Sequence, residues 1–97
     1  MPIETRPFDA SEFLGSAEAQ AEFIRAALES GDRAHIGRAI GIVARARGMG
    51  EIAKAAGLSR ESLYRSLRED GDPRLSTLLG VMDAIGLSLS VAPKAAA

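Results

Sequence analysis

The sequence predicts a single small domain, residues 1–97, built from five α-helices with a short β-strand near the C-terminus. Three observations indicate this fold class. Apolar residues recur at the 3.6-residue period of a helix through most of the chain. Glycines or an Asp-Gly-Asp-Pro turn end the periodic stretches, and alternation at period two begins only after the last of them. A chain of 97 residues buries only about 60–65% of its unfolded surface, so a small core is expected.

The N-terminal part, residues 9–31, predicts acidic helical structure. A short helical turn over 9–14 has acids at its cap and three residues further on, which is the pattern of a capping box. Ser16 is the expected N-cap of a longer helix over 16–30, and Gly31 is the expected residue that ends it.

Residues 32–86 predict the core of the domain. A helix over 32–47 carries Gly37 and Gly41 four residues apart on one face, although each glycine costs about 0.8–1 kcal/mol of helix stability relative to alanine. A close approach of another helix to this face is therefore expected. The Asp-Gly-Asp-Pro turn separates this region from a last helix over 73–85, whose leucines recur at helical spacing.

Between these helices, the stretch 49–68 has the spacing of a helix–turn–helix motif. Two short helices, over 49–56 and 59–67, are expected on either side of Gly57, which supplies the positive φ of a tight turn. Ala53 is expected to be small because the two helices cross there. The apolar seam between the helices is expected to contain Ile52, Ala56, Leu58, Leu63 and Leu67.

Charge is unevenly distributed along the chain, although the formal net charge is only −1. Residues 1–32 sum to −5, residues 33–69 to +5 and residues 70–97 to −1. A basic middle attracts phosphate and an acidic front repels it, so two partners of opposite charge are expected. The alternative is an accidental clustering of charges on solvated helix faces.

In the DNA-binding form of the motif, the first turn of the second helix reads base edges in the major groove. Arginine, serine and glutamate side chains supply the donors and acceptors that such reading needs. The base-reading candidates are Ser59, Arg60, Glu61, Ser62 and Arg65. The phosphate-binding candidates are Gly50 through nearby backbone N–H groups, Lys54, Tyr64 and Arg68. A purely structural helical hairpin is the alternative.

The acidic N-terminal part supplies candidates for contact with a basic partner. Phe8 and Phe13 are candidate apolar anchors, with packing in the core as the alternative. Glu18 and Glu22 lie four residues apart on one helix face, where a solvated face is the alternative and a metal-binding pair a weaker one.

Leu87, Leu89 and Val91 alternate with small polar residues, which predicts a strand over 87–93. No other segment of the sequence predicts a strand that could pair with it. Pairing with the same strand of a second copy would satisfy both backbones, so these three residues are expected to form a homodimer interface. The alternative is an extended tail.

Composition excludes several classes of site. The chain has no cysteine and one histidine, His35, so no disulfide, thiolate zinc site or thiol nucleophile is expected. A catalytic triad would have to use that single histidine. We therefore expect a binding protein without a cofactor or metal, rather than an enzyme. The N-terminus has no apolar signal core and no apolar run reaches ~18 residues, which indicates a cytoplasmic protein without membrane contact.

The chain resembles a known family over about residues 4–91. The stretch 49–68 resembles the helix–turn–helix of the Cro/phage-repressor (Xre) class. Nearly the whole chain resembles the antidote (antitoxin) proteins of type II toxin–antitoxin addiction modules. The stretches that carry this resemblance are 6–9, 44–49, 57–64, 71–73 and 78–79.

The resemblance implies a Cro/repressor-like fold, binding of a dimer to its own double-stranded operator DNA, and a small basic toxin with a RelE/ParE-like fold. The family usually has a polar residue where Gly50 stands, so a side-chain phosphate contact is not expected there. In this interpretation residues 49–68 bind the operator and residues 9–30 engage the toxin. The alternatives are a prophage-type repressor without a toxin and a helical protein–protein adaptor.

Overall fold

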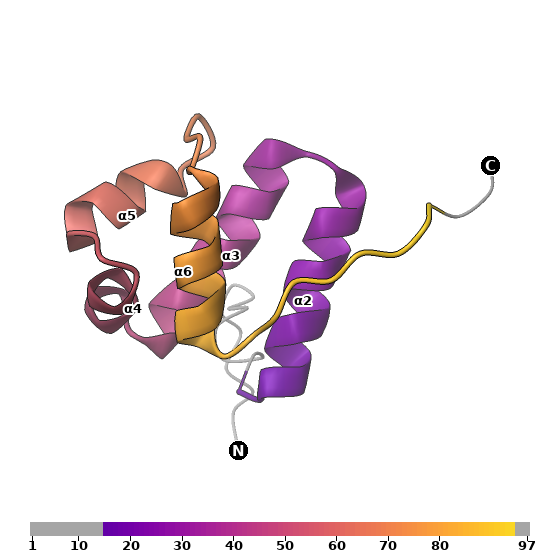
Figure 1. Ribbon diagram of the computed structural model, residues 1–97, viewed down its shortest axis with the longest axis horizontal. Helices are drawn as coiled ribbons and strands as arrows, with labels where there is room; N and C mark the ends of the chain where they lie inside the picture. The colour runs from indigo at the N-terminus through magenta and orange to yellow at the C-terminus, as the bar shows by residue number, and fades with distance from the viewer. Residues whose placement is uncertain (1–14, 95–97) are drawn as a thin grey trace, which may run out of the picture.

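The computed structural model describes residues 15–94, and all regular secondary structure in that range is helical (Figure 1). The five helices confirm the predicted all-α class, whereas the helical turn expected over 9–14 lies outside the described residues. In chain order the helices are α2 (Ala17–Ser30), α3 (Arg33–Arg47), α4 (Met49–Ala55), α5 (Arg60–Ser66) and α6 (Leu75–Ile85).

The ends of α2 and α3 follow the capping rules that predicted them. Ser16 precedes α2 with extended backbone, and its Oγ accepts a hydrogen bond from the Ala19 N–H at 3.1 Å. Gly31 ends α2 at φ 69°, a left-handed conformation that suits glycine. Asp32 then caps α3 by accepting from the Ala34 N–H at 3.0 Å. The largest difference from the predicted bounds is at α6, which begins at Leu75 rather than at residue 73. The bounds of the other described helices lie within one residue of those predicted.

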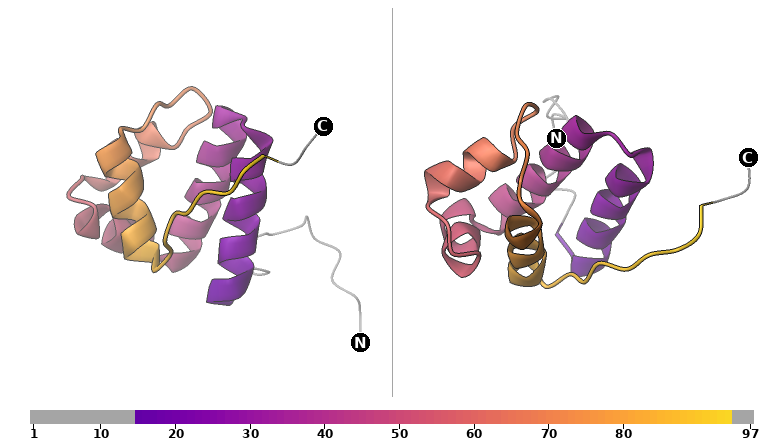
Figure 2. Two further views of the ribbon diagram at one scale, coloured as in Figure 1. Left: turned by 45° about the vertical axis from the view of Figure 1, so that its right-hand side comes forward. Right: turned by 45° about the horizontal axis from the view of Figure 1, so that its top comes forward.

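The helices pack around one hydrophobic core (Figures 1 and 2). α2 packs against α3, α3 packs against α4 and α6, and α4 also contacts α5 and α6. Side chains from α2, α3, α5 and α6 fill the centre, while α4 contributes residues beside them. The largest fully buried side chains are Ile24, Ile40, Val43, Leu63, Val81 and Ile85.

The pair α4–α5 has the seam that the sequence predicted. Ile52, Ala53, Leu63 and Leu67 are buried, and the remaining predicted members are half-buried against the same core. Gly57 adopts φ 76° in the connecting turn, as expected. The turn is closed by a 2.8 Å hydrogen bond from the N–H after this glycine to the Ala53 carbonyl.

The predicted C-terminal strand is wrong for the part of the chain that the structure describes. Residues 87–94 form an extended tail with no strand, and the tail runs along α2 (Figure 2). A strand needs a neighbouring strand to pair with its backbone, and residues 15–94 contain none. Leu87 still packs on the core, whereas Leu89 is 38% exposed and Val91 is fully exposed.

Gly37 and Gly41 allow α3 to lie close to the C-terminal end of α5. A Cβ built at residue 37 would lie 3.0 Å from the backbone carbonyl oxygen of Leu67. A Cβ built at residue 41 would lie 3.8 Å from the Leu67 Cβ, which is an ordinary van der Waals contact. The close approach expected at these glycines is therefore present, and it is tight only at Gly37.

We expect the substitutions Gly37→Ala and Gly41→Ala to have opposite effects on stability. Gly41→Ala should raise the free energy of unfolding by about 0.5–1 kcal/mol, because alanine favours the helix and the new methyl group has room. Gly37→Ala should lower it by about 1–2 kcal/mol, because the methyl group displaces a rigid backbone carbonyl. Urea denaturation of both variants measures the difference, and equal effects would contradict this account of α3–α5 packing.

Candidate functional site

The first turn of α5 is held in place by Ser59. Its Oγ accepts a hydrogen bond from the Ser62 N–H at 3.0 Å and donates one to the Ser62 Oγ at 2.9 Å. The Ser59 hydroxyl is therefore engaged in capping the helix, and it orients the turn that follows. Ser62 is half-buried, which leaves Arg60 and Glu61 as the exposed side chains of this turn.

The exposed charges of α5 differ in their partners. Glu61 and Arg65 form an ion pair at 3.5 Å, one turn apart, and both side chains are largely exposed. Arg60 has no ion pair within residues 15–94, and its guanidinium instead lies 5.7 Å from the centre of the Tyr64 ring. An exposed ion pair contributes little stability, so Arg65 can exchange Glu61 for another anion at small cost.

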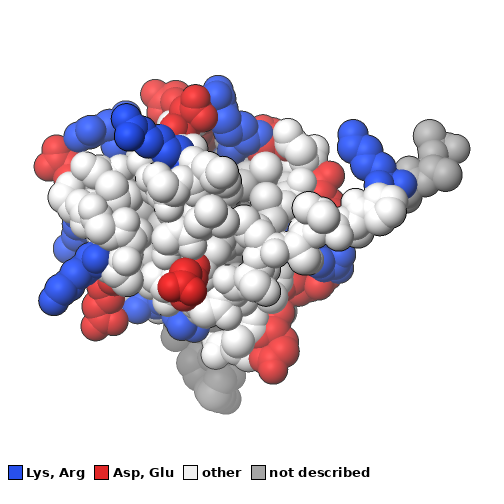
Figure 3. All heavy atoms as spheres, viewed as in Figure 1, with Lys and Arg blue, Asp and Glu red and all other residues white. Residues whose placement is uncertain are grey.

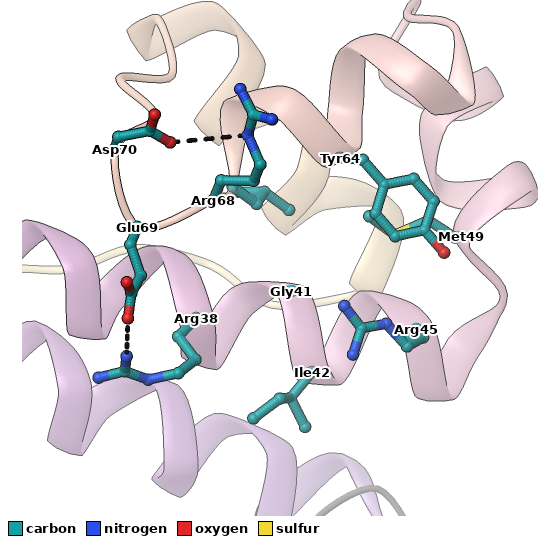
Figure 4. Close-up of a pocket in the computed structure, with 10 residues that line it drawn as sticks. Arg38, Gly41, Ile42, Arg45, Met49, Tyr64, Arg68, Glu69 and Asp70 are labelled. Atoms are coloured by element: carbon teal, nitrogen blue, oxygen red, sulfur yellow. Dashed lines mark hydrogen bonds and ion pairs between the residues drawn. The ribbon is translucent and has the colours of Figure 1, made fainter.

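Tyr64 is contacted by cations from two helices. Besides Arg60 of α5, Arg45 near the end of α3 lies over the same ring at 5.9 Å (Figure 4). The nearby Arg60 guanidinium is the main cause that lowers the pKa of the Tyr64 phenol, and Arg45 lowers it further. Desolvation of the phenol opposes this shift without reversing it. We call Arg45, Arg60 and Tyr64 the Tyr64 cluster.

The Tyr64 cluster borders a shallow groove of about 630 Å³ between α3 and α5, which we call the α3–α5 groove. Figure 4 shows Gly41 and Ile42 along α3 on one side and Tyr64 on the other. Met49 lies at one end, beside the Tyr64 ring, and residues 67–70 close the other end.

Ion pairs neutralise half of the basic residues that the charge pattern counted. Of the eight cations in residues 33–69, four are paired with carboxylates. The pairs are Arg33–Asp72 at 3.8 Å, Arg38–Glu69 at 3.0 Å, Arg65–Glu61 at 3.5 Å and Arg68–Asp70 at 3.6 Å. The sum of +5 therefore overstates the unpaired positive charge of this region.

Four other cations of this region have no ion pair in the part of the chain that the structure describes: Arg45, Arg47, Lys54 and Arg60. Arg47 is turned toward α2, where it donates to the Gln20 Oε1 at 3.2 Å. Of the phosphate candidates, Gly50 and Lys54 are exposed on α4, Tyr64 is in the cluster, and Arg68 is paired. Arg45 was missed, because nothing in the sequence indicates that it meets a tyrosine 19 residues further on.

The N-terminal candidates are placed only in part. Phe8 and Phe13 lie outside the described residues. Glu18 is exposed in the first turn of α2. Glu22 forms an ion pair with Arg25, which also reaches Glu29 at 3.3 Å. This hydrogen-bonded arginine lowers the pKa of the Glu22 carboxyl, so the acidic face of α2 is partly compensated.

Residues 15–94 contain no group of three or more histidine, cysteine or acidic side chains placed to hold a metal ion. None of the described helices is long and apolar enough to cross a membrane.

Apolar side chains are exposed on α6 and the tail. Leu75 and Leu79 are 69% and 48% exposed, and Leu89 and Val91 of the predicted dimer strand are also exposed. The face of the molecule that carries α6 and the tail is largely uncharged (Figure 3). Leu87 differs, because it packs against the core of its own chain.

One family model and one relative match this chain over nearly its full length. A family model described as "Probable addiction module antidote protein" matches residues 4–93. A relative from Haemophilus influenzae, named "Uncharacterized protein", is 37% identical over 91 residues, which cover 94% of each chain. No solved structure matches the chain at a significant level. The match over residues 4–93 shows that the chain belongs to the family of probable addiction module antidote proteins.

Proposed function

We propose that this protein is a DNA-binding antitoxin, which represses its own operon and neutralises a partner toxin. The observation that carries the DNA-binding part is the exposed first turn of α5, which Ser59 caps and from which Arg60 extends without a carboxylate partner in residues 15–94. The pair α4–α5 presents this turn on a buried seam, as a helix–turn–helix motif requires.

The side chains of α5 suit the major groove. Arg60 can donate two hydrogen bonds to a guanine, and Ser62 can donate to or accept from a base edge. Arg65 and Glu61 are paired with each other in the absence of DNA, so both can rearrange when a base or phosphate approaches. Gly50 and Lys54 on α4 are the proposed contacts to the flanking phosphates, together with Arg68.

The proposed DNA-binding form is a homodimer. Leu89 and Val91 are exposed on the tail, and Leu75 and Leu79 are exposed on α6. This surface is largely uncharged, so it suits neither DNA nor a basic protein, whereas a second copy would present the same apolar residues to it (Figure 3). Two copies would also place two α5 helices for an inverted repeat.

The antitoxin part of the proposal rests on family membership and on the acidic N-terminal region. Addiction modules pair an antidote with a toxin, and the proposed toxin is a small basic protein with a RelE/ParE-like fold. Residues 1–32 sum to −5, and Glu18 on α2 is exposed. Charge complementarity would mainly speed the encounter, while apolar side chains such as Phe8 and Phe13 would supply most of the affinity.

We expect two copies of the protein to bind specifically to an inverted repeat in the DNA upstream of its own gene. Arg60→Ala should cost about 1–3 kcal/mol on that DNA and relax the preference at one base position. Arg33→Ala is the matched control, because it removes an equal charge from a residue that is paired with Asp72. Fluorescence anisotropy on the upstream and a scrambled duplex measures the affinities, and sedimentation measures the stoichiometry.

Equal affinity of the wild-type protein for upstream and scrambled DNA at every salt concentration would contradict the repressor proposal. If a single chain binds the upstream DNA specifically, the repressor proposal stands and the homodimer proposal is contradicted.

We expect the product of the adjacent gene to bind through the N-terminal third of this protein. Glu18→Lys combined with Glu22→Lys should slow the association and reduce its dependence on salt, because attraction between opposite charges is lost. Glu51→Lys combined with Asp72→Lys changes the net charge equally at one unpaired and one paired exposed acid outside α2, and it should leave association close to wild type. Surface plasmon resonance at several salt concentrations measures both rates.

If both double variants slow the association to the same extent, α2 is not part of the interface. If the adjacent gene product does not bind the wild-type protein, the toxin part of the proposal is contradicted and the repressor part still stands.

A further inference from the structure

The Tyr64 cluster joins two helices that the sequence does not connect. Arg60 lies one turn before Tyr64 on α5, and Arg45 comes from the last turn of α3. Their guanidinium carbons lie 5.7 and 5.9 Å from the centre of one aromatic ring. Two like charges this close to one group repel each other, and the ring compensates because its face is electron-rich.

Carboxylates are present around the same groove, but they pair with other arginines. Arg38 pairs with Glu69, and Arg68 pairs with Asp70 (Figure 4). The two carboxylates lie on the loop that closes the far end of the α3–α5 groove. Arg45 and Arg60 have no ion pair within residues 15–94. The Tyr64 end of the groove therefore carries two positive charges that lack an anion.

We infer that Arg45 binds a backbone phosphate of the DNA and that Tyr64 positions Arg45 and Arg60 together, one for the phosphate and the other for the base edge. This inference rests on the proposed DNA binding by α5. A guanidinium group matches the oxygens of a phosphodiester and forms charge-assisted hydrogen bonds with them. The chemical class of ligand is thus a phosphodiester of a duplex backbone.

A shared ring has a consequence for docking. Arg45 belongs to α3, so its phosphate contact would attach α3 to the DNA backbone while α5 enters the major groove of the DNA. Both arginines are held against one ring. The position of α5 in the DNA major groove and the position of the phosphate contact would therefore depend on each other. Tyr64 acts here as a positioning residue, in addition to any contact of its own hydroxyl with phosphate.

The cluster can be tested first without DNA. Tyr64 is the only tyrosine and the chain has no tryptophan, so phenolate absorbance during a pH titration reports this group alone. The neighbouring arginines stabilise the phenolate, so the wild-type pKa should lie below its usual value of about 10. Arg60→Ala should move the pKa upward most, Arg45→Ala less, and Arg47→Ala should leave it unchanged. An unshifted wild-type pKa would mean that the cluster does not form.

The decisive experiment measures salt dependence of binding to the upstream duplex and to its scrambled version. Each phosphate contact on duplex DNA contributes about 0.9 to the slope of log affinity against log salt concentration. Arg45→Ala should reduce this slope by about 0.9 and weaken both duplexes by the same factor. Arg47→Ala, the matched control, removes an equal charge two residues away on a side chain turned toward Gln20, and it should leave the slope unchanged.

Tyr64 variants separate positioning from a direct contact. Tyr64→Phe keeps the ring and should retain both the salt slope and the preference for the upstream duplex. Tyr64→Leu removes the ring and should lower both, and circular dichroism checks that the variant is folded.

The outcomes distinguish this inference from the proposed function. A wild-type protein that binds neither duplex overturns the proposed DNA binding. A wild-type protein that binds, with identical slopes for Arg45→Ala and Arg47→Ala, overturns the phosphate contact and leaves the proposed function standing. Wild-type behaviour of Tyr64→Leu overturns the positioning role.

Discussion

The contact between α3 and the end of α5 determines most of the geometry described above. Gly37 has no side chain, so the backbone carbonyl oxygen of Leu67 lies only 3.0 Å from the position that a Cβ would occupy. The Leu67 side chain is buried in the core. This contact holds the C-terminal end of α5 close to α3. The α3–α5 groove, the reach of Arg45 to Tyr64 and the ion pair between Arg38 and Glu69 all depend on that close approach.

Exposed ion pairs have a second effect in this molecule, although each contributes little to stability. Glu69, Asp70 and Asp72 follow α5 directly, and each carboxylate lies within 4 Å of an arginine nitrogen. The loop thereby neutralises one end of the basic region and leaves the other end positive. The unpaired positive charge lies at the last turns of α3 and α4 and the first turn of α5. That localisation makes a specific DNA contact a reasonable proposal.

Local features were predictable from the sequence, and features that depend on tertiary partners were not. The helices, the caps at Ser16 and Asp32 and the turn at Gly57 follow from short-range rules, and the structure confirms them. The strand was predicted wrongly because alternation specifies a face but cannot supply the partner that a ladder requires. Arg45 was missed for a related reason, since its contact with Tyr64 depends on how α3 and α5 cross. Family membership came from similarity over residues 4–93, not from any single site.

The two helices that carry the proposed DNA site are only seven residues long. Isolated helices shorter than about 12–15 residues are marginal in water, so neither would persist without the core that Leu63 and Ile52 join. The arrangement of Arg60 and its neighbours therefore exists only while the whole domain is folded. Local loosening of the core would dissolve the site as a unit, and cellular proteases that capture such openings would remove binding activity together with the chain. In this protein the site therefore lasts only as long as the domain stays folded.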